Sequence, residues 1–575
     1  MKGLAADISC FRLTVGLSIC ALFFFAVRDG PTQQASGMPL ASSAIPVLVM
    51  RTDGQAVVDR ARVRARIDAF SQHRTSEADE VRIEYSGRAE LSIRGNTSYY
   101  FQKKSYRLEL QNESANDTKA PLLGMPPDSD WVLYASVTDR TFARNLLAHE
   151  LWRRMGRYAV RCRYVELFVI TNGWPTATSE EIRKQIPRVL DVLPITHASA
   201  AGLTFSNMQN TTASILAESY MGFYVLMEKI KRGKERVNIA KLRRGDSREP
   251  EISGGYIIKK DDQGRNERGL LTGQEVGLRF EDPKESKLTA EQKGWMANYL
   301  GDCEKALFGR NFRDADNGYG KYIDVDSFVD FHWLVEVSQN ADGFWFSQYM
   351  HKDRGGKLTM GPVWDWDNAF GNPFFSESRR TNGWRFESAQ DPDYTWYRRL
   401  FEDPDFLQRY VDRWSGLRTN ILATSNVLAV VDGIVSQLKG AQRRNTARWE
   451  LEGRHASLRA RVGVSLEDEV KLLKDWITGR LSWIDSQEFP KPVAQFETES
   501  ESTEPKVVLT CVVGRVFYTT DGSDPRARGG SVAPTSTAYS VPIAAPPQSV
   551  ITARVRSEFG LWSAPVKVQA PFVTQ

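Results

Sequence analysis

The chain has 575 residues, of which 76 are basic and 71 acidic, giving a net charge of +5; 41% of residues are hydrophobic and 11% aromatic. This length exceeds what one hydrophobic core usually spans, so two or three domains are expected. The balanced charge, without a long basic run, argues against nucleic acid as a partner. The hydrophobic content excludes a largely disordered chain.

The N-terminal segment is typical of an exported protein. An apolar run, Phe11–Val27, has basic residues near its start and is followed by polar sequence. This pattern predicts a signal peptide or uncleaved signal anchor in residues 1–30, followed by a linker in residues 31–45. We therefore expect a secreted or cell-envelope protein that meets a membrane only through this segment. The three cysteines beyond it are widely scattered and predict neither a disulfide framework nor a zinc site.

Residues 46–111 are expected to be mainly β, because short alternating runs are broken by turn residues such as Asp53-Gly54. The next segment, Asp139–Gly156, has apolar residues at helical spacing, a candidate N-cap in Asp139 and a terminal glycine. It predicts an amphipathic helix.

Two further strands, Tyr164–Ile170 and Met221–Ile230, are separated by a polar stretch without a clear period. We interpret the stretch between Trp174 and Ala217 as an insertion that forms either a lid or nothing with a function.

The following third of the chain combines a strand at Gly254–Lys259 with a helix at Asp324–Asn340, capped by Asp324 or Asp326. Helical periodicity returns over residues 403–487, where Ser465 and Asp468 have the spacing of a capping box.

An acidic, linker-like stretch at residues 489–505 precedes a different kind of sequence. Residues 506–575 contain short strands and turns throughout, and they predict a small all-β sandwich.

The stretch GPVWDWDNAFGN places Asp365 and Asp367 between tryptophans. Because an ionised carboxylate is costly to desolvate, a cation is expected beside them. An Arg or Lys partner would serve a structural role, whereas a divalent metal is the functional alternative, since Mg²⁺ and Mn²⁺ prefer oxygen ligands. The stretch alone leaves both open.

The order of the elements matches the parts of a kinase. Protein kinases use a strand lysine and a helix glutamate near the phosphates, a catalytic-loop aspartate, and a second aspartate after a short hairpin that holds Mg²⁺. The residues available for these roles are Lys103 or Lys104, Glu150, Asp342 and Asp365.

Each of these residues also has a structural alternative. Lys104 can be a solvated strand residue, and Lys103 competes with it because neighbouring strand residues point to opposite faces. Glu150 can simply pair with Arg154 four residues later. Asp342 can be only the turn residue that follows a helix.

Several blocks of this sequence resemble the successive motifs of the CotH kinase family, named for a spore coat protein. They run in order from about residue 46 to about residue 400, and RGNTS…KKSYRLEL and GPVWDWDNAFG are the most specific of them. The resemblance implies an α+β, atypical protein-kinase-like core over residues 46–488, with a β-rich N-terminal lobe and a helical C-terminal lobe. It also implies binding of ATP with Mg²⁺ or Mn²⁺ and phosphorylation of Ser or Thr in protein substrates.

The resemblance assigns roles to individual residues. Lys104 corresponds to the phosphate-binding lysine, with Glu150 as its helix glutamate, and Glu228 stands at a hinge-like strand end near the adenine. Asp342 corresponds to the catalytic aspartate and Asp365 to the metal-binding one. Asp367 is then a further carboxylate at the metal.

The chain departs from the family pattern in two places. The stretch between Trp174 and Ala217 interrupts a strand pair that the family joins closely, and one metal ligand differs. Where the family has an asparagine five residues after the catalytic aspartate, this sequence has Ser347 followed by Gln348. Either side chain can substitute, but the second metal position is in doubt.

The C-terminal segment around VFYTTDGSDP resembles the chitobiase/hexosaminidase C-terminal β-sandwich module. Such modules stand beside carbohydrate-active or surface domains, so the resemblance implies either stabilisation of the neighbouring domain or contact with a glycan or the envelope.

Two other functions compete with a kinase. One is a surface adhesion or scaffold protein whose kinase-like core has lost activity, which export and Ser347 favour because ATP is scarce outside the cytoplasm. The other is a glycoside hydrolase using Asp365 and Asp367, which is disfavoured because its two carboxylates must flank the scissile bond at defined separations.

Overall fold

The computed structural model describes residues 45–570, except 59–60, 75–78, 96, 172–176, 194–211, 262–268, 373–376, 439, 450–464, 498–505 and 547. The predicted export segment lies outside these residues. Within them, no helix combines the length and the apolar character needed to cross a bilayer.

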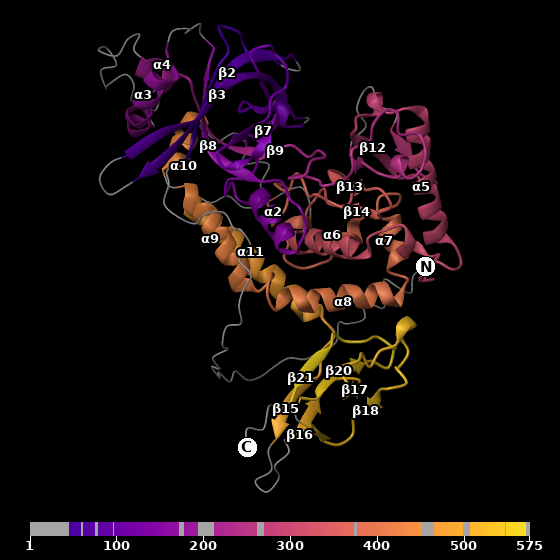
Figure 1. Cartoon of the computed structure of the whole chain (residues 1–575). Coiled ribbons are helices and arrows are strands. Elements are labelled where there is room, and N and C mark those ends of the chain that lie inside the picture. Colours follow the sequence, from indigo (N-terminus) through magenta and orange to yellow (C-terminus); the bar gives the residue numbers. More distant parts are fainter. Residues whose placement is uncertain are drawn as a thin grey trace.

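Seven strands of the N-terminal part form a closed barrel (Figure 1). In spatial order they are β1 (Val47–Arg51), β2 (Val63–Arg74), β3 (Asp79–Arg94), β4 (Ser105–Gln111), β7 (Asp130–Tyr134), β9 (Tyr220–Glu228) and β8 (Cys162–Ile170). The barrel closes where β1 pairs in parallel with β8, with Leu48 opposite Leu167. The mainly β start is thus confirmed, but its closure into a barrel was not predicted.

Alternate residues along the strands belong to two apolar clusters, one inside the barrel and one on its outer face. Leu48 on β1 is buried inside with Trp131 and Leu226, whereas its neighbours Val47 and Val49 pack in a second cluster on the outer face. Successive strand residues point to opposite faces, so one short strand serves both cores.

Two helices from the predicted insertion cover this outer face. They are α3 (Ser179–Val192) and α4 (Thr212–Glu218). Thr178 and Glu181 form a capping box at the start of α3, and Ile182 and Leu216 join the outer cluster. The described part of this stretch therefore contributes to the barrel's packing.

Helix α2 (Arg144–Arg154) connects β7 to β8 and is shorter than predicted. Its N-cap is Ala143, so the prediction of Asp139 as N-cap is wrong. Asp139 instead lies in the preceding turn, where its carboxylate accepts the N–H of Thr141 at 3.0 Å and that of Arg144 at 2.8 Å. It still satisfies a free N–H of the first turn, from outside the helix.

The next part combines an antiparallel sheet with helices. The sheet order is β11 (Leu270–Leu271), β12 (Gly277–Asp282), β10 (Tyr256–Lys260), β13 (Gln348–Lys352) and β14 (Leu358–Met360). The helices are α5 (Ala290–Phe308), α6 (Val325–Ser338), α7 (Thr395–Leu400), α8 (Pro404–Arg418), α9 (Thr424–Val435), α10 (Ala441–Trp449) and α11 (Leu466–Gln487). The predicted Asp324 cap of α6 and the Ser465/Asp468 capping box of α11 are confirmed.

Helix α10 returns to the barrel after most of the helical part is complete. Arg444 forms an ion pair of 2.7 Å with Glu166 on β8. Asn445 accepts a hydrogen bond of 2.9 Å at Oδ1 from the Nζ of Lys103, which also donates to the main-chain oxygens of Ala135 and Phe223. Helix α10, from the C-terminal half of the chain, therefore packs against the barrel and is bonded to it.

A small β domain completes the chain. One sheet contains β15 (Val493–Glu497), β16 (Lys506–Thr510) and β19 (Ile543–Ala544); the other contains β18 (Thr537–Ala538), β17 (Arg515–Thr519), β20 (Val550–Arg556) and β21 (Val566–Gln569). A shared apolar core, including Val507, Val516 and Val555, is buried in this domain. Strand β15 lies inside the stretch predicted as a linker.

This β domain lies next to α8 (Figure 1), and ion pairs join the two. Arg554, which is 2% exposed, binds Asp412 of α8 at 2.7 Å and Asp524 of its own domain at 2.6 Å. Arg526 pairs with Asp405, also on α8, at 2.7 Å. The chain is thus a mixed α+β protein, as predicted, whose terminal domain is fixed by charges.

Candidate active site

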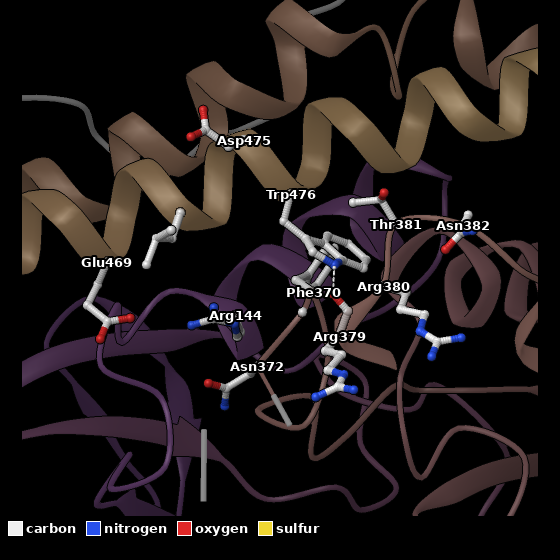
Figure 2. Close-up of a pocket in the computed structure, with 12 residues that line it drawn as sticks. Arg144, Phe370, Asn372, Arg379, Arg380, Thr381, Asn382, Glu469, Asp475 and Trp476 are labelled. Atoms are coloured by element: carbon white, nitrogen blue, oxygen red, sulfur yellow. Dashed lines mark hydrogen bonds between the residues drawn. The ribbon is translucent and has the colours of Figure 1, made fainter. Parts of the chain in front are cut away.

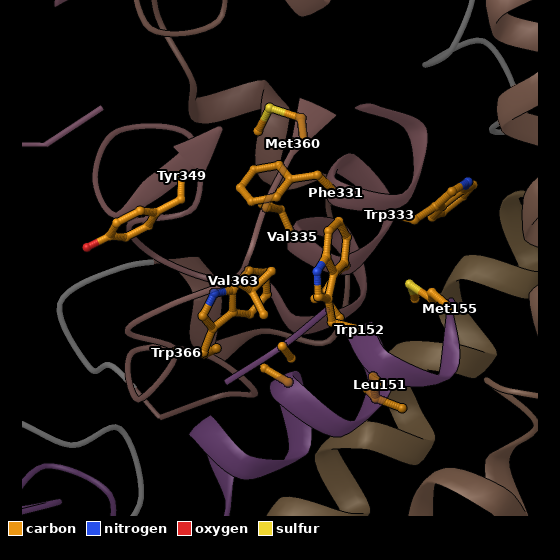
Figure 3. Close-up of a cluster of buried hydrophobic side chains, with 14 of the residues drawn as sticks. Leu151, Trp152, Met155, Phe331, Trp333, Val335, Tyr349, Met360, Val363 and Trp366 are labelled. Carbon is orange, nitrogen blue, oxygen red and sulfur yellow. The ribbon is translucent and has the colours of Figure 1, made fainter. Parts of the chain in front are cut away.

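The two carboxylates of GPVWDWDNAFGN flank a buried tryptophan. Trp366 is 1% exposed and meets Phe331 of α6 edge to face at 6.4 Å, while Phe331 meets Trp152 of α2 at 6.3 Å (Figure 3). Trp366 is held in this core, whereas Asp365 beside it is exposed and Asp367 is half-buried.

Helix α2 also fixes the backbone of this segment. The Asn145 Oδ1 accepts the N–H of Trp366 at 2.5 Å. At Gly361, φ is +101° and a Cβ would lie 2.8 Å from the Trp152 ring, so glycine is required both by conformation and by space. The apolar residues that seemed out of place beside two charges are therefore the anchors of an acidic segment.

Asp342 reaches the same place from the end of α6. The residue after the helix, Gln339, has a left-handed backbone with φ of +50°, which ends α6 and starts the turn. Asn368 then joins the two segments, because its Nδ2 donates to the Asp342 Oδ2 at 3.0 Å and its carbonyl accepts the N–H of Ala341 at 2.9 Å. The predicted catalytic and metal-binding segments are thus held together.

Burial and neighbouring carboxylates raise the proton affinity of Asp365 and Asp342. The pKa of Asp365 is raised well above its usual range by the surrounding protein and by the charges of Asp367 and Asp342. The pKa of Asp342 is also raised, mainly by burial and further by Asp367. Asp365 nevertheless remains exposed to solvent. Its side chain is therefore within reach of a cation from solution.

Two hydroxyl groups of the barrel side face these carboxylates. The Thr138 hydroxyl donates to the Asp367 Oδ2. The Tyr134 hydroxyl is buried without a hydrogen-bond partner among the described residues, and the charges of Asp367 and Asp365 help to raise its pKa. Sequence reasoning missed both residues, since their roles depend on how the end of β7 meets the acidic segment.

Arg94 is a cation whose charge acts on Asp365, and sequence reasoning also missed it. Arg94 ends β3, and its guanidinium lies 5.4 Å from the centre of the Trp364 ring. Its charge lowers the pKa of Asp365, but burial and the two other carboxylates raise that pKa by more. Arg94 opens the RGNTS motif, so the specificity of that motif was a signal for its importance.

The predicted phosphate-binding pair is not brought together. Lys104 donates to the main-chain oxygen of Tyr99 at 2.5 Å and lies over its ring. Glu150 accepts from Arg153 and, at 2.9 Å, from Arg154, which is the structural pairing considered for it. Their ATP-binding roles stay predictions that the observed contacts do not support.

The competing Lys103 is buried and faces only oxygen acceptors and aromatic rings. Its Nζ lies 4.5 Å from the centre of the Tyr224 ring. Because its ammonium is desolvated without a carboxylate partner, its pKa is well below the usual range. Lys103 links the barrel to α10, away from the acidic segment.

Glu228, predicted near the adenine, is 0% exposed and already occupied. Its carboxylate accepts from the Tyr158 hydroxyl at 2.9 Å and from Arg161 at 2.8 Å through both the main-chain and guanidinium N–H. Its role toward ATP stays a prediction, and its observed role is to fix the end of β9.

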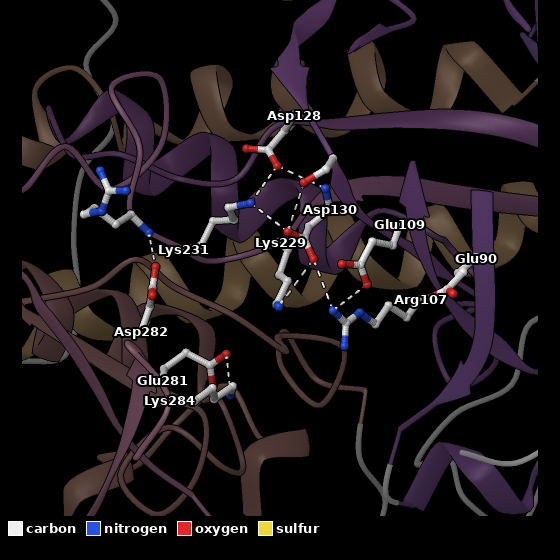
Figure 4. Close-up of polar contacts among 12 residues, drawn as sticks. Glu90, Arg107, Glu109, Asp128, Asp130, Lys229, Lys231, Glu281, Asp282 and Lys284 are labelled. Carbon is white, nitrogen blue, oxygen red and sulfur yellow. Dashed lines mark hydrogen bonds and ion pairs between the residues drawn. The ribbon is translucent and has the colours of Figure 1, made fainter. Parts of the chain in front are cut away.

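Beyond Glu228, a charged network surrounds the connection from the barrel to the antiparallel sheet. Lys231 binds both Asp128 and Asp130, at 2.8 and 2.7 Å, and the next residue's N–H donates to Asp282 at 2.8 Å (Figure 4). Lys231 and Asp130 shift each other's pKa toward the charged forms. This network fixes the angle between the two sheets beside the candidate site.

Ser347 lies just before β13 with φ of +54° and has no hydrogen-bond partner among the described residues. The neighbouring Gln348 is buried, and its Nε2 has no partner. No observed contact places the side chain of Ser347 or Gln348 beside Asp365, so the metal-binding role of Ser347 stays a prediction.

Among the described residues, no group of three or more His, Cys, Asp or Glu side chains is arranged to hold a metal ion. The donor set at the acidic segment still fits a nucleotide-bound cation, since Mg²⁺ is commonly held by one or two carboxylates together with phosphates and water. Asp365 and Asp367 supply those carboxylates, and the unpartnered Tyr134 hydroxyl beside them supplies a further polar group.

A cavity of about 480 Å³ lies beside this segment (Figure 2). Its lining residues are Arg144, Phe370, Gly371, Asn372, Arg379, Arg380, Thr381, Asn382, Glu469, Leu472, Asp475 and Trp476. Asn372 belongs to both places, because its Nδ2 donates to the main-chain oxygens of Asp367 and Thr138 at 2.7 and 3.1 Å.

The fold and the site define a mixed α+β protein with a solvent-accessible acidic site between its barrel and its helical part. The family model described as "CotH kinase protein" matches residues 91–484. This match covers more than half of the 575 residues, so the chain belongs to the CotH kinase family and is a kinase-like protein. Comparison with curated proteins gave no match.

Proposed function

We propose that this chain is an ATP-dependent and Mg²⁺- or Mn²⁺-dependent kinase that phosphorylates Ser or Thr in a protein substrate. The observation that carries the proposal is the junction of Asp342 and Asp365 through Asn368, which joins two segments that a kinase must hold together. Family membership supports the same reaction class.

Asp342 is the proposed proton acceptor for the substrate hydroxyl. Asn368 orients its carboxylate, and its raised pKa brings the group closer to the pH at which a base accepts protons efficiently. Its other oxygen is not used by Asn368 and is available to the substrate.

Asp365 and Asp367 are the proposed holders of the metal. When bound, Mg²⁺ or Mn²⁺ supplies positive charge that offsets the phosphates of the nucleotide. The chain's own contribution is to position the two carboxylates through Trp366 and to fix Asp367 through Thr138.

Arg94 is the proposed phosphate-binding cation, in place of Lys104. A guanidinium can donate two parallel hydrogen bonds to a phosphate, and Arg94 is the cation whose charge acts on Asp365. Lys104 by contrast is directed to the oxygen of Tyr99.

We place this activity outside the cytoplasm, in a secreted or envelope-associated protein. The apolar run Phe11–Val27 supports this location. A reporter fused at Pro46 is expected to be active only in the exported compartment, and reporter activity in the cytoplasm would contradict it.

The function itself is tested by ligand-dependent thermal stability. A ligand that binds only the native state raises the midpoint of unfolding, so ATP with Mg²⁺ or Mn²⁺ should stabilise the full chain more than ATP or the metal alone. Transfer of the γ-phosphate from labelled ATP to a Ser-rich protein mixture is the second readout. Stabilisation without transfer would indicate a nucleotide-binding scaffold, and absence of both would reject the kinase proposal.

A further inference from the structure

The cavity beside the acidic segment has an excess of unused hydrogen-bond donors from arginine. Arg379 is exposed, and its side chain has no partner among the described residues. Arg144 is 5% exposed, and although one of its guanidinium nitrogens binds Asp139 and Thr141, its buried Nε has no partner. Both side chains line the same cavity (Figure 2).

The acidic residues that line this cavity form ion pairs with cations other than Arg379. Glu469 pairs with Arg140 at 3.5 Å, and Asp475 pairs with Lys471 at 2.6 Å. The remaining lining cation, Arg380, pairs with Glu377 at 2.6 Å. Arg379 is consequently a lining cation without an ion-pair partner among the described residues.

The cavity walls also favour a side chain over a free ion. Phe370, Leu472 and Trp476 supply apolar surface, and the Trp476 indole donates to the main-chain oxygen of Arg379 at 2.9 Å, which fixes the backbone beneath its guanidinium. An acidic side chain offers both an aliphatic stem for these walls and a planar carboxylate for the guanidinium fork.

The position of the cavity relates it to the proposed reaction. Asn372 lines the cavity and donates to the main-chain oxygen of Asp367, whose carboxylate belongs to the catalytic cluster. The cavity therefore adjoins, through Asn372, the segment that carries Asp365 and Asp367.

We propose that this cavity is a specificity subsite that binds an acidic side chain of the protein substrate, with Arg379 as its anion-binding residue. The inference rests on the proposed kinase function and names the chemistry by which the substrate is chosen.

The test uses labelled peptides with a single Ser in a Gly/Ala background, carrying one Glu or one Gln at each position within four residues of the Ser. Binding to the full chain is measured by fluorescence anisotropy without ATP. At least one Glu peptide is expected to bind about tenfold more tightly than its Gln counterpart, since one charge-assisted bidentate contact commonly has an effect of this size.

Arg379→Gln should abolish that difference, because the exposed side chain can be replaced without disturbing the core. Arg310→Gln is the matched control, as Arg310 is also exposed and without a partner among the described residues, and it lies outside the cavity. Equal binding of Glu and Gln peptides at every position would overturn the proposal, as would a preference that persists in Arg379→Gln. Competition by inorganic phosphate without any Glu preference would identify a free-anion site and also overturn it.

The readout separates this inference from the kinase proposal. Equal phosphorylation of acidic and neutral peptides, with equal binding, would reject the subsite and keep the kinase. Selective binding of a Glu peptide without phosphate transfer would keep the subsite and reject the kinase.

Discussion

Asn368 donates a hydrogen bond of 3.0 Å from its Nδ2 to the Oδ2 of Asp342, and so ties the turn after α6 to the segment that carries Asp365 and Asp367. Asp342→Asn should leave ATP binding intact and lower phosphate transfer by about two or more orders of magnitude, because a proton acceptor acts mainly in the transition state. Single-turnover transfer and nucleotide binding are measured side by side. Asp326→Asn, an exposed change at the start of α6, is the control. Loss of ATP binding in Asp342→Asn would assign Asp342 to the nucleotide site instead.

Asp365→Ala should abolish ATP binding that depends on Mg²⁺ or Mn²⁺ while leaving the metal-free protein as stable as before or more stable. The substitution removes a ligand, and it also removes repulsion from Asp367 and Asp342. Differential scanning fluorimetry with and without ATP and metal measures both effects. A variant that unfolds while nucleotide binding is unchanged would show that Asp365 belongs to a structural ion pair.

The same carboxylate predicts how stability depends on pH without metal. The pKa of Asp365 is raised in the folded state, so the folded protein binds its proton more tightly than the unfolded chain does. This stabilising contribution is complete below the unfolded pKa of about 4 and is lost as the pH rises through the folded pKa. Asp365→Asn should flatten this part of the curve of unfolding free energy against pH, and an unchanged curve would contradict the raised pKa.

Arg94→Gln should raise the KM for ATP by about tenfold or more, whereas Lys104→Gln should change it little. A charged hydrogen-bond donor to phosphate commonly contributes on this scale. The charge of Arg94 acts on Asp365, whereas Lys104 is directed to the main-chain oxygen of Tyr99. The reverse order of effects would restore Lys104 as the phosphate-binding residue.

Removal of the C-terminal β domain should leave nucleotide binding intact. A chain that ends at residue 488 lacks the contacts of Arg554 and Arg526 with α8. Loss of these contacts exposes aspartates of α8 rather than apolar surface. In the full chain, Arg554→Gln should lower the unfolding free energy by about 1–3 kcal/mol, because Asp412 and Asp524 lose their shared partner. Chemical denaturation of the three proteins measures this, and a truncated chain that unfolds or loses ATP binding would show that the core depends on the β domain.

Much of the site could be predicted from local sequence. The hairpin before GPVWDWDNAFGN and the helix ending before Asp342 are local features, and the structure confirms β13, β14 and α6. The choice between Lys103 and Lys104 could not be made locally, because their environments depend on Asn445 and on a turn around Tyr99. Arg94 was missed for the same reason, since its relation to Asp365 exists only after folding.

Closure of the barrel was beyond local patterns as well. The parallel pairing of β1 with β8 joins residues more than a hundred positions apart, and alternation in each strand reveals only that both faces are buried. The helix α3 did carry a signal, the Thr178/Glu181 capping box, within a stretch whose polar composition concealed it.

The hydrogen bond from Lys103 to Asn445 connects residues that are 342 positions apart. All strands of the barrel have been synthesised by Glu228, yet the buried ammonium of Lys103 lacks its side-chain acceptor until α10 emerges. The barrel therefore cannot reach its final state as an independent N-terminal unit during translation. The hydrogen bond of Lys103 to Asn445 forms only after α10 has been synthesised. The barrel and the helical part are therefore completed together, late in folding.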